Sequence, residues 1–184
     1  MANLKITELA ALTTVLGEDL LAIVDDPTGT ASTKKIRTDD FQSTWHVGAR
    51  VYNSGNISVA DSSAVALTFD SERYDTDGIH STVLNTGRLT CQTAGKYLIS
   101  GNVEFAANAT GQRQLYIRLG GATIIGFTQP SVISAVTGRY QVSTIYDLAA
   151  SNYVELVVNQ SSSGSLNVTA AANWSPEFMM HRIG

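Results

Sequence analysis

The chain has 184 residues, of which 43% are hydrophobic and 15% charged, and its formal net charge is -4 at pH 7. This length suits one domain with a short extra segment, and the composition is that of a folded chain rather than a disordered one. The negative charge leaves no basic surplus to neutralise phosphates, which argues against nucleic acid or an anionic membrane surface as the main partner.

The single cysteine and the hydropathy pattern limit the class of protein further. Cys91 alone can form neither an internal disulfide framework nor a multi-cysteine zinc site. No stretch approaches the roughly 18 consecutive apolar residues of a membrane span, and the N-terminal segment lacks the pattern of a secretory signal. We therefore expect no membrane insertion, and synthesis in a cytoplasm.

Residues 1–47 predict a small hairpin rather than a domain. An apolar run from Leu20 to Val24 is followed by the turn residues 25–29 and by an extended pattern from Thr33 to Ile36. A lone hairpin is marginally stable in water, and this segment has too few apolar residues for a core of its own. We expect it to dock on another protein through its apolar side chains: Leu20, Leu21, Ile23, Val24 and Ile36.

Residues 48–184 predict an all-β sandwich. Strand-length runs recur about every 10 residues between turn clusters, and 18 serines and 20 threonines against 3 prolines favour strands and turns. In the clearest run, Gly95 to Ala106, alternate residues share one face: Tyr97, Ile99, Val103 and Phe105. The other predicted strands are 50–52, 65–69, 88–91, 114–119, 123–127, 140–148, 153–160, 166–170 and 177–183.

Two of these strands are apolar on both faces. Tyr153 and Val157 lie opposite a second apolar set on one strand, and Phe178 and Met180 lie opposite Met179 and Ile183 on the other. One face of a sandwich strand buries only one set, so the second is covered either deeply within a monomer or by identical subunits. The candidate subunit-interface residues are Tyr153, Val157, Phe178 and Met180.

An acidic stretch, residues 70–78, carries the only pattern with ligand chemistry for an ion. Alternate carboxylates before Gly78 bring hard oxygens together, as calcium requires. The expected structure is a solvated loop with Asx turns and no cofactor, and the alternative is calcium bound by Asp70, Asp75 and Asp77.

Motifs for catalysis are missing from the sequence. The three histidines lie in unrelated contexts, and there is no nucleophile elbow, Walker loop or dinucleotide-binding glycine pattern. We therefore expect no enzyme, although a site assembled from distant strands stays open. Trp174 is the candidate recognition residue, since an exposed aromatic ring stacks on sugar rings, and the loops at 120–126 and 131–138 would complete an apical surface with it.

The domain-length segment resembles a known family. Gly87 to Cys91 followed by Gly95 to Ile99, then residues 143–148 and 153–156, and finally the ending from Pro176 to Gly184, are similar to the core motifs of the C1q/tumour-necrosis-factor-like (C1q/TNF-like) jelly roll. The sequence departs from that pattern at residues 149–152, where a Gly-Asp pair is usual, and at His181. The resemblance implies a jelly-roll sandwich that forms compact three-fold trimers.

The N-terminal segment resembles the short leaders of tailed-bacteriophage fibre and appendage proteins, through its ITEL, EDLLAIVDD and TKKI stretches. Together the two resemblances imply a virion-anchoring segment, 1–47, and a jelly-roll domain, 48–184. The expected function is that of a non-enzymatic, trimeric, capsid-attached fibre or decoration protein, assembled in the host bacterial cytoplasm and located on the virion. Its expected partners are capsid or tail proteins and a host-surface glycan. The alternatives are a tail-associated receptor-binding fibre protein and a free carbohydrate-binding module.

Overall fold

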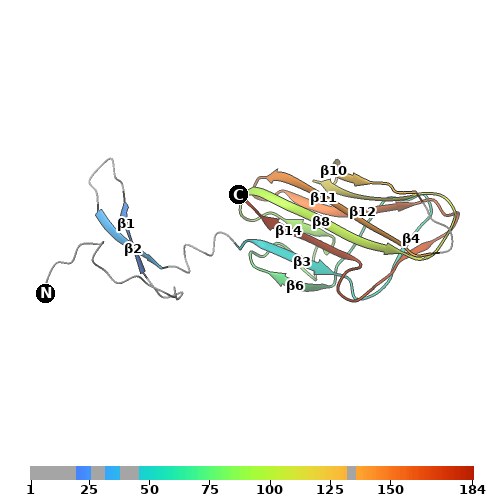
Figure 1. Cartoon of the computed structure of the whole chain (residues 1–184), viewed down its shortest axis with the longest axis horizontal. Helices are drawn as coiled ribbons and strands as arrows, with labels where there is room; N and C mark the ends of the chain where they lie inside the picture. The colour runs from blue at the N-terminus through green and yellow to red at the C-terminus, as the bar shows by residue number, and fades with distance from the viewer. Residues whose placement is uncertain (1–19, 26–31, 38–45, 132–135) are drawn as a thin grey trace. The chain divides into compact units, whose positions relative to one another are not determined.

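The computed structural model describes residues 20–25, 32–37, 46–131 and 136–184 (Figure 1). These residues form strands, turns and loops, and no helix occurs among them. The chain divides into two compact units, Met1–Thr44 and Trp45–Gly184. The second unit is called the head below.

The first unit contains the predicted hairpin. Strands β1 (Leu20–Asp25) and β2 (Ser32–Arg37) pair antiparallel, with Leu20 opposite Arg37 and Asp25 opposite Ser32. Residues 26–31, which include most of the predicted turn at 25–29, lie outside the described residues. The side-chain surroundings of the five candidate anchoring residues also lie outside the description, so their docking role stays a prediction.

The head is a sandwich of two antiparallel sheets. The larger has seven strands: β3 (Gly48–Tyr52), β4 (Ile57–Val59), β6 (Ser71–Asp75), β8 (Gly95–Phe105), β11 (Gly138–Leu148), β13 (Leu166–Val168) and β14 (Glu177–Arg182). The smaller has five: β5 (Val65–Ala66), β7 (Arg88–Thr90), β9 (Arg113–Leu119), β10 (Thr123–Thr128) and β12 (Tyr153–Gln160).

The strand order places β8 inside the larger sheet and β12 inside the smaller one. In the larger sheet the order is β11-β8-β14-β3-β6, and β4 joins through β13, which pairs with the end of β8. In the smaller sheet the order is β10-β9-β12, and β5 and β7 pair with successive parts of β12. Sequence neighbours therefore often lie in different sheets, as in a jelly roll.

The core fills the space between the sheets. Tyr97, Ile99, Val103 and Phe105 on β8 are all buried, which confirms the predicted face of that strand. Gly101 lies among them and faces Leu156 of β12 so closely that a Cβ at this position would overlap the leucine side chain. Burial of this apolar face is the main stabilising contribution to the head.

Two short strands were missed by the sequence pattern. The acidic stretch is not one loop, because Ser71–Asp75 forms strand β6 and pairs with β3 at the edge of the larger sheet. Its central residues Glu72, Arg73 and Tyr74 are all exposed, so no apolar alternation marks the strand. Strand β4 has only three residues, too few for a periodic pattern.

The predicted subunit-interface residues need correction. Phe178 and Met180 have no exposed surface, and the Phe178 ring stacks on Phe69 inside the core with ring centroids 5.9 Å apart. Val157 is also completely buried within the head. These three side chains are covered within one chain, so they cannot contact a second copy. Tyr153 is half-buried, with the Arg88 guanidinium 4.0 Å from its ring centroid.

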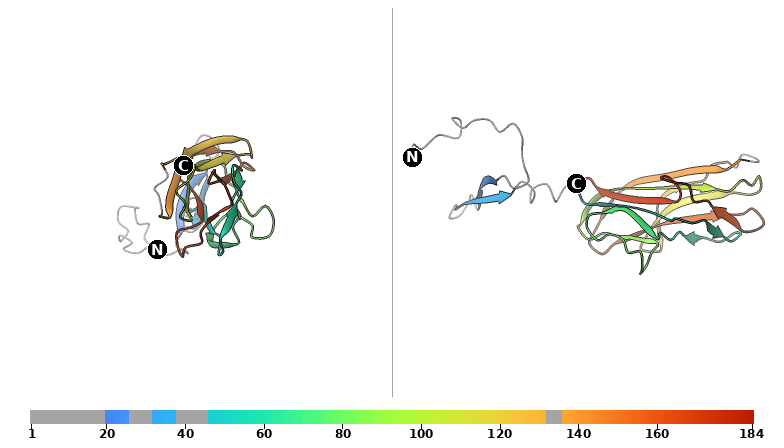
Figure 2. Two further views of the ribbon diagram at one scale, coloured as in Figure 1. Left: turned by 90° about the vertical axis from the view of Figure 1, so that its right-hand side faces the viewer. Right: turned by 90° about the horizontal axis from the view of Figure 1, so that it is seen from below.

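The C-terminus marks one end of the sandwich, called the terminal end below (Figure 2). At the terminal end, the Lys96 amide donates to the Gly184 carbonyl at 2.8 Å and the Arg182 amide to the Val47 carbonyl at 2.8 Å. At the other end, called the distal end below, lies the loop that contains Trp174. The prediction that the loop at 120–126 shares one apical surface with Trp174 is therefore wrong. The Gly120 amide donates to the Tyr153 carbonyl at the terminal end, whereas Trp174 lies at the distal end.

Candidate functional site

The loop between β13 and β14, residues 169–176, organises the distal end. The Ala171 amide donates to the Ser175 carbonyl at 2.7 Å and the Ser175 amide donates back to the Ala171 carbonyl at 3.1 Å. The Ser175 hydroxyl donates to the Thr169 carbonyl at 2.8 Å and accepts from the Glu104 amide at 2.7 Å. These bonds fix the loop against β8, so the side chains that it carries are held in place.

Trp174, the candidate recognition residue, is half-buried on this loop and lies beside Arg139 of β11. The Arg139 guanidinium is 4.8 Å from the ring centroid, and its Nε donates to Glu104 Oε2 at 2.9 Å. Glu104 Oε1 in turn accepts from the Thr169 hydroxyl at 2.9 Å. A hollow of about 280 Å³ opens here, lined by Asn102, Val103, Arg139, Tyr140, Gln141 and Trp174.

A second hollow of about 270 Å³ adjoins the same loop. It is lined by Tyr52, Asn53, Ser54, Arg73, Ala170, Ala171, Ala172, Asn173 and Ser175. The Arg73 guanidinium lies 4.0 Å from the Tyr52 ring centroid, so the arginine and the tyrosine form one stacked unit in the wall. No local sequence pattern indicates this hollow, since its residues come from three distant segments.

Glu177, at the start of β14, sets the charge of this second hollow. The residue has no exposed surface, and its Oε2 accepts from Arg50 Nε at 2.6 Å. Its Oε1 accepts from Arg73 Nη2 at 3.0 Å and from Arg73 Nε at 3.2 Å. Arg50 Nη2 also donates to the Asn173 carbonyl at 2.9 Å, which ties the ion pair to the loop.

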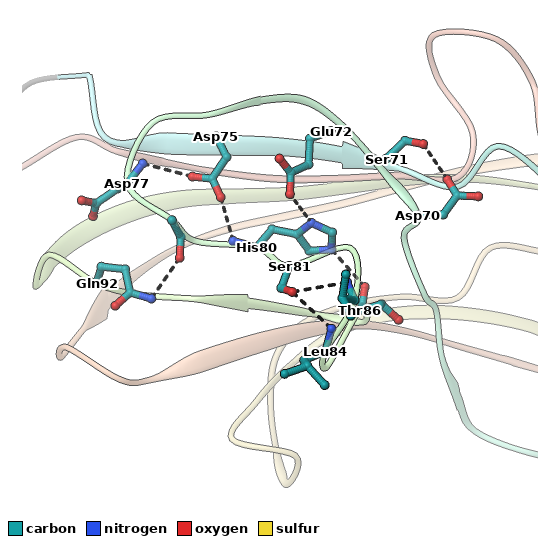
Figure 3. A network of polar contacts seen from close by, with 12 residues as sticks. Asp70, Ser71, Glu72, Asp75, Asp77, His80, Ser81, Leu84, Thr86 and Gln92 are labelled. Atoms are coloured by element: carbon teal, nitrogen blue, oxygen red, sulfur yellow. Dashed lines mark hydrogen bonds and ion pairs between the residues drawn. The ribbon is translucent and has the colours of Figure 1, made fainter.

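The three candidate calcium ligands do not converge on one point, and the carboxylates of Asp70 and Asp75 accept bonds from different protein groups (Figure 3). Asp70 accepts from the Ser54 hydroxyl and amide at 2.6 and 3.0 Å and from the Ser71 hydroxyl at 2.8 Å, and the bond from the Ser54 hydroxyl is the main cause that lowers the pKa of Asp70. Asp75 accepts from the amides of Asp77 and His80 at 3.0 and 2.8 Å. Asp77 Oδ2 is buried and has no hydrogen-bond partner among the described residues. Within the described ranges, no three Asp, Glu, His or Cys residues gather as a metal site requires.

The outward face of the larger sheet carries exposed aliphatic side chains. Leu98 on β8 and Ile145 on β11 are directly opposite each other, with 44% and 60% of their surfaces exposed. On β14 the outward residues are Met179 and His181, since Phe178 and Met180 point inward. The sequence pattern places apolar residues on both faces of β14, and the candidate interface residues Phe178 and Met180 belong to the inward set.

The comparisons with known proteins concern the head. No protein-family model and no curated protein matches the sequence. Among solved structures, the globular domain of zebrafish complement 1qA superposes with a TM-score of 0.52 at 12% identity over 75% of this chain and 98% of that chain. Eiger TNF from S. frugiperda gives 0.53 at 13% identity over 76% and 93%, and murine APRIL gives 0.58 at 11% over 75% and 99%.

These likenesses define the class of fold. The head is a C1q/TNF-like jelly roll, as the sequence resemblance implied. At these identities the likeness establishes the fold alone. What this chain binds depends on its own surface residues. The described part of the chain contains no helix that is long and apolar enough to cross a membrane.

Proposed function

We propose that this chain is a non-enzymatic structural protein of a bacteriophage virion surface, a homotrimeric capsid-attached fibre or decoration protein with an exposed jelly-roll head. The observation that supports a trimer is the exposed aliphatic pair Leu98 and Ile145 on a C1q/TNF-like head. Domains of this type commonly form homotrimers. The virion role draws its support from the leader-like sequence of residues 1–47.

A closed ring of three copies needs two different surfaces that fit each other. The first is the outward face of the larger sheet, with Leu98, Ile145 and Met179. The second is strand β10, where Ile124 and Phe127 are 53% and 52% exposed. Strands β10 and β11 contact each other at the same edge of the sandwich. We propose that the β10 edge of one copy packs on the larger sheet of the next.

The β1–β2 hairpin is the proposed attachment element. Two strands alone leave unpaired backbone groups and apolar side chains, and addition of a partner strand would satisfy both. The substitution Ile23→Asp places a charge in β1. It is expected to abolish incorporation into particles while the head still forms trimers, and Ser58→Asp, an exposed change in β4, is the matched control.

Purified particles provide the readout. Loss of the Ile23→Asp protein from particles, with the control retained, supports attachment through the hairpin. Wild-type occupancy of the Ile23→Asp protein would contradict it and transfer attachment to the head. Labelling the head in intact particles distinguishes a capsid location from a tail location, which is the first alternative.

The distal hollows favour a recognition role for the head in addition to a structural one. Trp174 and Arg139 in the first hollow and Tyr52 and Arg73 in the second combine aromatic rings with planar donors. This combination also fits a free carbohydrate-binding module. Such a module would be missing from particles altogether, so the particle experiment separates the two functions.

A further inference from the structure

We propose that the distal end binds an acidic oligosaccharide, with a sugar carboxylate in the Tyr52–Arg73 hollow and the adjoining sugar ring against Trp174. This inference rests on the recognition role proposed for the head. It is the same whether the protein is attached to a capsid, attached to a tail or free. It names a ligand class that the sequence pattern did not indicate.

Charge is the first argument for an anionic ligand. Arg50 and Arg73 share the single buried carboxylate of Glu177. The group of three therefore carries one net positive charge, and the side chains of Arg50 and Arg73 keep 36% and 30% of their surfaces exposed. Asp70 lies behind the wall at Ser54, and both of its oxygens accept hydrogen bonds from Ser54 or Ser71.

Donor geometry is the second argument. Arg73 uses Nε and Nη2 on Glu177, and its Nη1 donates no hydrogen bond to any of the residues that the structure describes. The stacking on Tyr52 holds the guanidinium plane in a fixed orientation. A fixed guanidinium with a spare edge is suited to a carboxylate, because its planar donors match the two carboxylate oxygens.

The shape of the hollow is the third argument. The wall opposite Arg73 is built from Ala170, Ala171 and Ala172, whose small side chains leave the space of about 270 Å³ open. Its position is fixed by the Ala171–Ser175 pair of hydrogen bonds and by the bond from Arg50 to Asn173. A site held in this way loses little conformational freedom when it binds.

The Trp174 hollow supplies the neighbouring subsite. Arg139 is neutralised by Glu104, so this hollow adds no net charge. The indole ring and the amides of Asn102 and Gln141 offer an apolar surface beside hydrogen-bonding groups, which suits an uncharged sugar ring. Both hollows include residues of the loop at 169–176, so the proposed ligand of two or three sugars would contact both sides of this loop.

The test is a titration of the full chain with three probes by calorimetry. The acidic probes are 3′-sialyllactose and digalacturonate, which separate the two common sources of a sugar carboxylate, and lactose is the neutral control. At least one acidic probe is expected to bind about tenfold or more tightly than lactose, with affinity falling as salt is raised. Equal binding of all three probes, or no binding of either acid at millimolar concentration, would overturn the proposal.

Two variants locate the binding. Arg73→Gln removes the spare donors, and Ala172→Leu fills the hollow from an exposed position without touching the ion pair. Each is expected to weaken binding of the acidic probe about tenfold or more. Ala150→Leu, exposed in the turn after β11, is the matched control and should bind as the wild type does. If acidic binding persists in the Ala172→Leu protein, the site lies elsewhere and the proposal is wrong.

The proposal and the proposed function fail in different experiments. Loss of carbohydrate binding leaves particle incorporation and trimer formation unchanged, because those depend on the hairpin and on the Leu98 face. Loss of particle incorporation in the Ile23→Asp protein leaves carbohydrate binding unchanged. A result in one experiment therefore does not decide the other.

Discussion

Leu98 and Ile145 face each other across strands β8 and β11 on the outside of the larger sheet, where both are exposed. His181 lies opposite Leu98 on the other side, from strand β14. Adjacent exposed aliphatic side chains on one open sheet face make this face a candidate contact surface. The proposed subunit contact therefore lies on the outward face of the larger sheet, whereas Phe178 and Met180 of β14 lie on its inward face.

Arg113 is expected to be a stabilising residue of the distal end. It is 1% exposed, and its guanidinium donates to the carbonyls of Thr110, Gln112 and Asn108 at 3.0, 2.8 and 3.2 Å. Burial lowers the pKa of this guanidinium from its ordinary value. Arg113→Met leaves the three carbonyls without their donor and should lower the free energy of unfolding by about 2–4 kcal/mol.

Denaturant unfolding with Lys96→Ala as the control measures this effect. Lys96 is exposed on β8, so its truncation should change stability by about 0.5 kcal/mol or less. An Arg113→Met protein as stable as the control would show that water satisfies the three carbonyls.

His80 is expected to hold the segment between β6 and β7. Its side chain has no exposed surface, its Nδ1 lies 2.8 Å from Glu72 Oε1 and its Nε2 lies 3.2 Å from the Thr86 carbonyl (Figure 3). His80→Ala removes both bonds and leaves a cavity, so we expect a loss of about 2–3 kcal/mol.

The same substitution should expose a protease site. Val83 and Leu84, 81% and 71% exposed, lie in the segment that His80 holds. Limited proteolysis should cut the His80→Ala protein there faster than the wild type or the exposed-histidine control His46→Ala. Equal cutting rates in all three proteins would contradict the role of His80.

Stability at alkaline pH should depend on Cys91 and Tyr97. Burial is the main cause that raises the pKa of both groups, and the Tyr97 hydroxyl donates to the Thr93 carbonyl at 2.6 Å. Because the folded state holds these protons more tightly than the unfolded state, the stability that the two groups contribute is fully present below the unfolded thiol range, about 8.5, and is lost as pH rises above it.

Thermal melts between neutral and strongly alkaline pH measure this dependence. The double variant Cys91→Ala with Tyr97→Phe should lose stability less steeply above that range than the wild type does. Identical pH profiles for the two proteins would show that other groups cause the alkaline loss.

Chelation is expected to leave the melting temperature unchanged. The carboxylates of Asp70 and Asp75 are engaged by protein donors at opposite ends of β6. An ion at a hundredfold excess over its dissociation constant would stabilise the head by about 2.7 kcal/mol, which a melt detects. A drop of several degrees on adding chelator, abolished by Asp75→Asn with Asp77→Asn, would establish calcium binding instead.

The sequence predicted the strands that alternate over many residues. The predicted run from Gly95 to Ala106 matches strand β8, Gly95–Phe105, because the inward side chains of β8 are mostly large and its outward ones are mostly polar. Strand β6 was not predicted, since a solvent-exposed edge strand needs no apolar residues and its acidic composition resembles a loop. The inward face of β14 could not be chosen, because Phe178, Met179 and Met180 are all apolar.

The candidate site was predicted only where one residue stands out. Trp174 is conspicuous as an aromatic side chain between turn residues, and the structure places it beside a hollow. Glu177 meets Arg50 across 127 positions in the chain and Arg73 across 104. No local pattern records such a contact, so the charged hollow emerges only from the pairing of β14 with β3 and of β3 with β6.

Sedimentation of the full chain at micromolar concentration tests the central claim, the homotrimer, most directly. We predict that the wild type sediments as one species of three times the chain mass. Leu98→Asp or Ile145→Asp should dissociate it to monomers that keep their β-sheet circular dichroism, and Ser58→Asp should leave it intact. A wild-type monomer at this concentration, or a trimer that survives both aspartate substitutions, would contradict the proposed assembly.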